Sequence, residues 1–408
     1  MTLLFGAPRR VGLALGRLVR PRGTGPAGTR PAGAGVPIVP YSCDDKGTTA
    51  KGTSVDTAAS RIRSEARAAA ARPATTVEDV VAALLAAWLV GGILSDAWAH
   101  VHRGKELEGF FTAWHGALYA GFAATAAWTF LLAYRRRYEQ PRWWRDGWPA
   151  GYRTSALAVL AFAVGGLADM AWHTRFGVEL GITAAFSPSH LLIGIAGALL
   201  VTGPLRSWWS AGAPAGPRAV AGIGSLALAV MVATPLLTHS VSLVTAAATV
   251  PYDPAVVQGP PRVAAVAAVD AYVVTTLLLV VPLLLVHRRR ATPGTGAAMV
   301  GGVALFVLVM FGFPAPQTVA ALAALAGAVV ADAALAWLDA ARGPEAPLRL
   351  PLAGGLYAAA VWTGHLVGLH LADGVRWPVE LWTGTVVLTA ALGALLGTLA
   401  ARPAAQLP

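Results

Sequence analysis

Long apolar segments alternate with short polar ones from residue 76 to residue 400. Each apolar segment runs for about 20 residues, the length at which an α-helix crosses the hydrocarbon core of a bilayer. We therefore predict ten spans, at residues 76–99, 110–133, 154–173, 188–206, 218–239, 263–286, 296–313, 317–338, 350–371 and 378–400. The pattern indicates an all-α fold, a polytopic membrane helix bundle of about ten transmembrane helices in the lipid bilayer.

The composition supports a membrane protein rather than a soluble one. The 408 residues are 56% hydrophobic and only 12% charged, and the mean hydropathy is +0.60. The net charge of +11 does not indicate a nucleic-acid partner, because the basic residues fall in short clusters between spans and in the first 72 residues. Cys43 is the only cysteine and precedes the first span, so a metal within the membrane domain requires His and carboxylate ligands.

The basic residues also predict the orientation of the chain. Arg residues gather before the first span, in the connection 134–153 and at every second connection after it, whereas the alternate connections hold few. By the positive-inside rule, both termini are cytoplasmic and the chain is a multi-pass protein of the cell membrane. Residues 1–72, rich in Gly, Pro and Arg, are predicted to be a disordered basic N-terminal tail, and residues 73–408 to be the transmembrane helical domain.

One polar motif occurs twice, each time where an apolar segment ends. Two stretches that begin 73 residues apart share the pattern D-x3-H-x5-E-L followed by a further His. The Asp and the first His are four residues apart, which places them on one helix face, and the last His opens the next helix. The members are Asp96, His100, Glu106 and His115 in the first copy, and Asp169, His173, Glu179 and His190 in the second.

Each copy is therefore expected to gather a carboxylate and two imidazoles on a helical hairpin at the outer membrane surface. The two hairpins, residues 76–133 and 154–206, each contain two spans and so share one orientation, as a parallel internal repeat requires. Helix capping is the plain alternative, since Ser187 followed by Pro188 is typical of a helix start. Capping does not require a matched His on the following helix, so the repetition favours a metal site.

An Asp with two His residues forms a ligand set that suits copper, zinc or iron and leaves coordination positions open. Open positions indicate chemistry or transfer at the metal rather than a purely structural ion. Copper is the predicted metal, because sites rich in imidazole generally bind it more tightly than competing divalent ions. Zinc accepts the same ligands and is the alternative.

The D-x3-H motif followed by a His on the next helix resembles the copper site in the C subunit of particulate methane and ammonia monooxygenases. The segments DAWAH, FFTAWHGALYAG and SPSHLL are also similar to uncharacterised multi-pass membrane proteins of high-GC bacteria. The resemblance covers about 110 of the 408 residues. It implies copper-ligand roles for the six Asp and His residues of the two copies, and an oxidase-like or monooxygenase-like activity.

Five other polar residues are candidates for contact with the ligands: Glu106, Glu179, Asp270, His365 and His370. Each glutamate either orients a His, serves as a ligand, or is a solvated loop residue. His365 and His370 are five residues apart on one predicted helix, so they do not face a single ion easily. Asp270 lies about 12 Å inside its span, where a carboxylate indicates a proton relay or a hydrogen-bonded partner.

Three functions stay open from the sequence, and with them the question whether the protein is an enzyme. The first is a copper-binding membrane protein, an oxidase-like or monooxygenase-like component; the second is a membrane transporter or metal-handling protein; the third is a structural membrane subunit without metal. Other membrane subunits are candidate partners. Few polar residues continue inward beyond Asp270, which favours a surface site over a conduit. Phosphate-binding loops and the G-x-S-x-G and H-E-x-x-H motifs are absent from the sequence.

Overall fold

The computed structural model describes residues 72–103, 110–179, 181–255, 259–289, 292–343 and 346–401. These residues form helices, and within them the only β-type pairing is an isolated bridge between Pro73 and Ala150. Nine of the described helices are long and apolar enough to cross a membrane, and α11 (Thr295–Phe311) is apolar but shorter. The predicted polytopic all-α fold is confirmed, with α11 in place of a tenth full-length span. The predicted tail lies outside the described residues except for Arg72.

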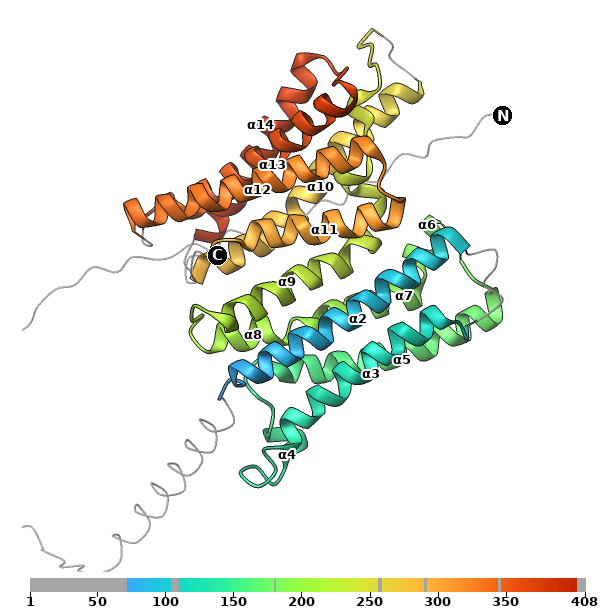
Figure 1. Cartoon of the computed structure of the whole chain (residues 1–408), viewed down its shortest axis with the longest axis vertical. Coiled ribbons are helices and arrows are strands. Elements are labelled where there is room, and N and C mark those ends of the chain that lie inside the picture. The colour runs from blue at the N-terminus through green and yellow to red at the C-terminus, as the bar shows by residue number, and fades with distance from the viewer. Residues whose placement is uncertain are drawn as a thin grey trace, which may run out of the picture. The chain divides into compact units, whose positions relative to one another are not determined.

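The chain begins with the helices that carry the repeated motif, below α9 in Figure 1, and continues with α10 to α14 above it. The first group is α2 (Thr76–Arg103), α3 (Ala113–Tyr134), α4 (Trp143–Asp146), α5 (Tyr152–Phe176), α6 (Ile182–Phe186), α7 (Pro188–Val201) and α8 (Gly203–Ser210). The others are α9 (Pro217–Leu236), the 3-10 turns η2 (Thr238–Ser240), η3 (Ser242–Val244) and η4 (Ala247–Thr249), α10 (Pro260–Arg289), α11, α12 (Ala315–Arg342), α13 (Arg349–Asp373) and α14 (Val379–Ala401).

The two predicted hairpins pack against each other as a four-helix bundle. α2 contacts α3 and α7, and α5 contacts the same two helices. α2 and α5 therefore occupy opposite corners, run in the same direction and end at the same end of the bundle (Figure 1). α8 continues α7 beyond Thr202, and the two together form one span, Pro188–Ser210. The predicted parallel repeat is thus present as two hairpins of like orientation.

Glycines let the two helices of each hairpin approach closely. In the first hairpin, a Cβ on Gly92 would lie 2.6 Å from Leu118 Cα, and in the second, a Cβ on Gly165 would lie 3.0 Å from Ile193 Cγ1. Small residues at such positions are typical of helix packing in membranes. Each glycine precedes the Asp of its motif by four residues, and Leu118 and Ile193 each follow the last His by three. The close contact therefore sets the register in which the Asp of one helix faces the His of the next.

A buried carboxylate ties together the opposite end of this bundle. Asp79, in the first turn of α2, is fully buried. It accepts hydrogen bonds from Tyr152 Oη of α5 at 2.8 Å, Ser207 Oγ of α8 at 3.0 Å and Arg218 Nε of α9 at 2.9 Å. The charge of Arg218 compensates the carboxylate, and hydrogen bonds hold both its oxygens. Four helices are thereby fixed relative to one another at this end.

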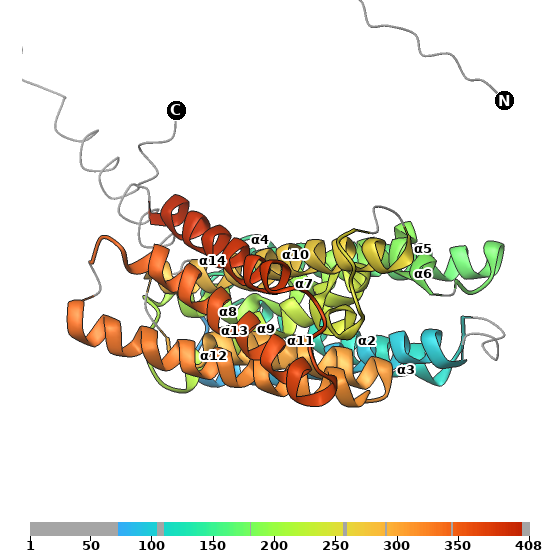
Figure 2. The ribbon, with the colours of Figure 1, turned by 90° about the horizontal axis from the view of Figure 1, so that it is seen from above.

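The remaining helices extend the bundle beyond α9. α9 contacts α2 and α7 as well as α11, and α13 packs between α12 and α14, as the view from above shows (Figure 2). The connection between α9 and α10 packs on the bundle, with Val241 and Leu243 buried. Asp332 of α12 caps the start of α11, where it accepts hydrogen bonds from the backbone N–H groups of Gly296 and Ala297 at 3.2 and 2.9 Å.

Candidate metal centre

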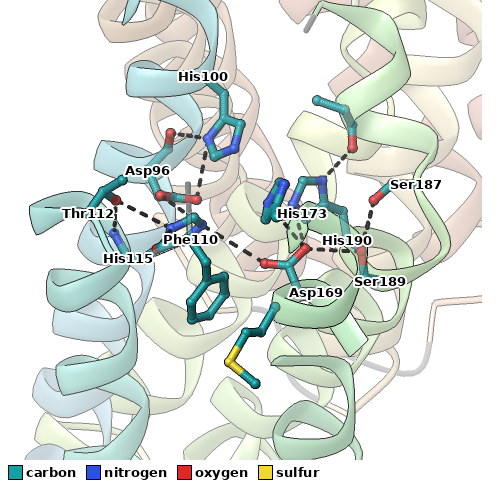
Figure 3. A network of polar contacts seen from close by, with 12 residues as sticks. Asp96, His100, Phe110, Thr112, His115, Asp169, His173, Ser187, Ser189 and His190 are labelled. Atoms are coloured by element: carbon teal, nitrogen blue, oxygen red, sulfur yellow. Dashed lines mark hydrogen bonds and ion pairs between the residues drawn. The ribbon is translucent and has the colours of Figure 1, made fainter. Parts of the chain in front are cut away.

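The six Asp and His residues of the repeated motif lie at one end of the four-helix bundle, and their side chains point toward one another (Figure 3). The sources are α2 for Asp96 and His100, α3 for His115, α5 for Asp169 and His173, and α7 for His190. Since α2 and α5 both end here and α3 and α7 both begin here, each hairpin supplies three of the six side chains.

Matching N-caps hold the last His of each copy. Thr112 Oγ1 accepts a hydrogen bond from the backbone N–H of His115 at 3.1 Å, and Ser187 Oγ accepts one from the backbone N–H of His190 at 3.3 Å. Both His residues are therefore the third residue of their helix. Ser187 is the N-cap of α7, as the sequence predicts. Its Oγ contacts only the backbone of His190, so the cap leaves the imidazole free to face Asp169.

Within each copy, both imidazoles lie close to the carboxylate of the same copy, as the sequence predicts. The distances are 3.6 Å from Asp96 Oδ2 to His100 Nδ1, 3.5 Å from Asp96 Oδ1 to His115 Nε2, 3.6 Å from Asp169 Oδ1 to His173 Nε2 and 3.1 Å from Asp169 Oδ1 to His190 Nε2. Each carboxylate is thus the point on which its own copy converges.

The two copies also meet each other, which the sequence did not predict. His115 Nε2 of the first copy lies 3.9 Å from Asp169 Oδ2 of the second. The ring centroid of His100 lies 5.8 Å from that of His173 and 5.7 Å from that of His190, and His115 lies 5.6 Å from His173. The sequence treats the copies as two trios, whereas the structure merges them into one cluster of six residues.

Each imidazole has its Nδ1 atom against a main-chain carbonyl oxygen. The pairs are His100 with Asp96 O at 2.9 Å, His115 with Phe110 O at 2.6 Å, His173 with Gly177 O at 3.3 Å and His190 with Ala184 O at 2.7 Å. A carbonyl oxygen only accepts, so in each pair Nδ1 donates. In His100, His115 and His173, Nε2 is then left to carry the lone pair of the neutral ring, whereas Nε2 of His190 lies 3.1 Å from Asp169 Oδ1. This arrangement is typical of metal-ligating His residues, whose other ring N–H is held by a carbonyl or carboxylate.

Four polar atoms of the cluster are buried and have no hydrogen-bond partner among the described residues. They are Nε2 of His100, His115 and His173, and Oδ1 of Asp96. The side chain of His173 is 0% exposed and that of His115 is 4% exposed. Unpaired buried polar groups are rare, and each carries a desolvation penalty of about 1–3 kcal/mol. Several lone pairs directed at one small volume are the arrangement that a metal ion satisfies.

Three overlapping groups of donors are able to hold an ion, and in each group the ligand atoms lie within 4.8 Å of one another. The groups are His100, His173 and His190; Asp96, His100 and His115; and His115, Asp169 and His173. Ligand atoms about 2.0–2.2 Å from one ion lie at most about 4.4 Å apart, so small side-chain rotations suffice to close any of these groups. Two of the three groups draw donors from both hairpins.

Two residues beside the cluster hold its members in place. Glu179 Oε2 lies 3.2 Å from His173 Nδ1, within ion-pair distance but without hydrogen-bond geometry; orienting a His is one of the roles that the sequence offers for this glutamate. Ser189 Oγ donates to Asp169 Oδ1 at 3.0 Å and itself pairs with Ser187 Oγ at 3.1 Å. Glu106, the corresponding glutamate of the first copy, lies outside the described residues.

The other three candidate residues are not brought to the cluster. Asp270 has an exposed side chain on α10. His365 is fully buried in α13, where its Nδ1 pairs with the hydroxyl of Tyr272 at 2.8 Å. His370 is exposed at the end of α13, and its Nδ1 accepts a hydrogen bond from the backbone N–H of Val375 at 3.4 Å.

A cavity of about 420 Å³ opens beside the cluster. Four residues of the cluster line one wall: Asp96, His100, Asp169 and His190. The other walls are mainly apolar and include Ile93, Leu118, Ile193, Val232, Phe306 and Met310, which come from α2, α3, α7, α9 and α11. The centre therefore faces an apolar space that extends as far as α11.

Sequence reasoning missed several residues that shape the centre. Tyr119 lies one turn beyond His115 on α3, lines the cavity, and has a buried hydroxyl without a hydrogen-bond partner in the described part of the chain. Phe110 stacks on His115 with ring centroids 4.7 Å apart. Two signals in the sequence point to this region: Gly four residues before each Asp, and Thr112 or Ser187 three residues before each last His.

These observations define a class of protein: an integral membrane protein of helical fold, with a buried centre of His and Asp residues able to hold a metal ion. No family model, curated protein or solved structure matches the chain.

Replacing Glu179 with Gln is expected to weaken metal binding by about 10–100-fold without abolishing it, because the amide orients His173 less strongly than the carboxylate. The dissociation constant, measured by competition with a chelator of known affinity, checks this. Glu139, exposed in the connection after α3, provides the matched control Glu139→Gln, for which no change is expected. An unchanged constant for Glu179→Gln would mean that Gly177 alone orients the ring.

Proposed function

We propose that this protein is an integral membrane copper protein in which both hairpins together hold the metal. One observation carries the proposal: three buried Nε2 atoms have no hydrogen-bond partner in the part of the chain that the structure describes, while the Nδ1 atom of each ring is held by the main chain. Polar residues that only cap helices do not account for buried imidazole nitrogens whose lone pairs are unpaired. Helix caps here involve Thr112 and Ser187 rather than the imidazoles.

Copper is favoured by the kind of ligand atom that is free. Imidazole nitrogens outnumber carboxylates four to two in the cluster, and copper generally exceeds other first-row divalent ions in affinity for nitrogen ligands. Zinc is the competitor, because it accepts the same ligands in a tetrahedral arrangement. The resemblance of the D-x3-H motif to the copper site of the monooxygenase C subunit supports copper independently of the geometry.

An oxidase-like or monooxygenase-like component fits the surroundings of the centre better than a transporter. Transport requires polar groups along the span, yet on α2 the positions facing inward from Asp96 include Ile93 and the buried Leu89. The next buried carboxylate on α2, Asp79, lies about 25 Å away along the helix and is fully hydrogen-bonded. Bound copper would supply one-electron redox chemistry at the end of the bundle, where a group of three protein donors leaves coordination positions open.

Metal analysis of the purified protein tests the proposal. After growth with both copper and zinc supplied, we expect at least one copper per chain and a paramagnetic signal with nitrogen hyperfine structure. The signal should be lost in His115→Ala and in His190→Ala, one variant from each hairpin. Stoichiometric zinc without copper would instead support a function in hydrolysis or metal handling. A protein without any metal would support a structural subunit.

We also propose that both termini are cytoplasmic, which puts the centre at the outer face of the cell membrane. The support is the placement of basic residues. Arg135, Arg136 and Arg137 follow α3 at the end of the bundle opposite the centre, close to the start of α2, where Arg136 donates to the carbonyl of Arg72.

A further membrane subunit against α10 is part of the proposal. Asp270 is exposed on α10 about 15 Å from the start of the helix, at a depth where the neighbouring exposed residues are apolar, such as Val266 and Leu277. A carboxylate facing lipid at this depth is costly, whereas one that pairs with a polar group of another subunit is not.

A further inference from the structure

The cavity beside the metal centre has the size and lining of a binding site for a small organic molecule. Its volume is about 420 Å³, within the range of about 300–1,000 Å³ that is usual for such sites. The side chains opposite the metal-binding wall are mainly apolar, so they favour a molecule with an apolar body. The cavity therefore differs from a solvent-filled approach to the metal, which would be lined by polar groups.

The mouth of the cavity is also apolar. Val101 of α2, Ile182 of α6 and Phe311 of α11 line the cavity and are themselves exposed, by 51%, 59% and 40%. All three stand at or beside the end of a long apolar helix, where a helix that crosses the membrane reaches the bilayer interface. A molecule dissolved in the membrane can reach the centre through such an opening without crossing a polar surface.

One residue that lines the cavity carries a polar group without a partner in the described residues. The hydroxyl of Tyr119 is buried and has no hydrogen-bond partner in the described residues, although a buried tyrosine hydroxyl usually finds one. The ring is held firmly, since a Cβ on Gly166 of α5 would lie only 2.8 Å from Tyr119 Cε1. Its centroid lies 6.2 Å from that of His115, so the hydroxyl and the metal ligands share one small space.

We propose that the cavity binds a lipid-soluble molecule with an alkyl or ring body and a single hydroxyl or carbonyl oxygen, which pairs with the hydroxyl of Tyr119 beside the metal centre. The inference rests on the proposed function in one respect: the bound molecule is a substrate only if the centre holds a metal that acts on it. The binding itself depends on the cavity and on Tyr119, and so can be tested with or without metal.

Photolabelling of the protein in lipid nanodiscs tests the inference. The probe is a decyl alcohol that carries a diazirine on its chain, and the comparison probe is the same alkyl diazirine without the hydroxyl. The alcohol is expected to label peptides of α2, α7 and α11 that line the cavity, at saturable occupancy. Tyr119→Phe should weaken alcohol labelling about tenfold and leave alkane labelling unchanged. The substitution removes the hydrogen bond to the hydroxyl of the alcohol, and the alkane makes no such bond.

A pair of alanines on α2 provides the matched control. Ala97 lines the cavity, and Ala87 is exposed on the same helix outside it. Ala97→Phe should fill the cavity and reduce labelling there at least fivefold, whereas Ala87→Phe should leave it unchanged. Metal content and elution as a monodisperse peak are recorded for each variant, so that misfolding is separated from blocking.

Two outcomes overturn the inference. Labelling that spreads over lipid-facing helices in proportion to their exposed surface would mean that the probe reports the bilayer only. Equal labelling by both probes, unaffected by Tyr119→Phe, would mean that the hydroxyl of Tyr119 does not recognise the alcohol. Because labelling is measured on chelator-treated and copper-loaded protein alike, a protein that binds no metal but is labelled at the cavity refutes the proposed function and leaves the binding site standing.

Discussion

Replacing His173 with alanine is expected to remove metal from the whole centre rather than from half of it. His173 belongs to two of the three donor groups, and in both of them a donor of the other hairpin takes part, His100 in one and His115 in the other. The third group does not contain His173, but it shares these same two donors, so one ion cannot be bound there independently of the others. Two independent sites would lose only the ion of the second hairpin. We expect the metal-to-protein ratio, measured by elemental analysis, to fall below about one tenth of the wild-type value. Mutating a residue that only contacts a metal ligand lowers metal affinity by about 10–100-fold, and removing the ligand itself lowers the affinity further.

The matched variants separate a shared centre from general disruption. His115→Ala changes the first hairpin and should give the same loss as His173→Ala. His102 lies two residues beyond His100 on α2, where its ring is exposed and its Nδ1 donates to the carbonyl of Trp98. The His102→Ala variant should therefore retain full metal content. If His115→Ala and His173→Ala each kept half of the metal, the two hairpins would be independent sites.

Replacing Asp79 with alanine is expected to destabilise the protein by about 3–5 kcal/mol, the range for removing one partner of a buried ion pair. The change leaves the charge of Arg218 and the hydroxyls of Tyr152 and Ser207 without their acceptor. Four helices lose their common contact at once. The expected readout is a fall of several degrees in the midpoint of thermal unfolding in detergent, at unchanged scan rate.

Asp146 provides the comparison for Asp79. Its carboxylate lies 3.5 Å from Arg142 and 3.9 Å from Arg145, but the side chain is 35% exposed. Asp146→Ala should therefore change stability by less than about 1 kcal/mol. Substituting Asp79 and Arg218 together with apolar residues should recover part of the loss, because no buried charge is then left unpaired. A midpoint for Asp79→Ala equal to that of Asp146→Ala would contradict the role assigned to the buried network.

The sequence predicts what depends on neighbours along one helix. Segment length and hydropathy are local properties, so the spans and the polytopic fold follow from them. The pairing of Asp96 with His100 and of Asp169 with His173 follows from the four-residue spacing, which places both side chains on one face. The N-cap at Ser187 is equally local and is found where the sequence predicts it.

The contact between the two copies depends on packing, which the motif does not encode. Bringing His115 within 3.9 Å of Asp169 requires α3 to lie against α5. At this contact Gly166 of α5 faces Tyr119 of α3, where a Cβ on the glycine would lie 2.8 Å from Tyr119 Cε1, and neither residue belongs to the motif. The fold thus converts two local pairs into one centre.

The sequence does not determine which way polar residues inside the spans face. His365 and Asp270 both lie inside predicted helices, and hydropathy does not reveal which way a side chain faces in a helix that is apolar all round. His365 turns inward to Tyr272, whereas Asp270 is exposed. The difference comes from the rotation of α13 and α10 against their neighbours, which is decided by tertiary contacts.

The division of the centre between two similar hairpins has a consequence for its assembly. A chain with one such hairpin would need a second copy to gather the same six side chains, and the fraction assembled would depend on protein concentration. Joining the hairpins in one chain makes this step intramolecular, with an effective concentration on the order of millimolar. Dilution in the membrane then leaves the centre intact, and its stoichiometry is one per chain.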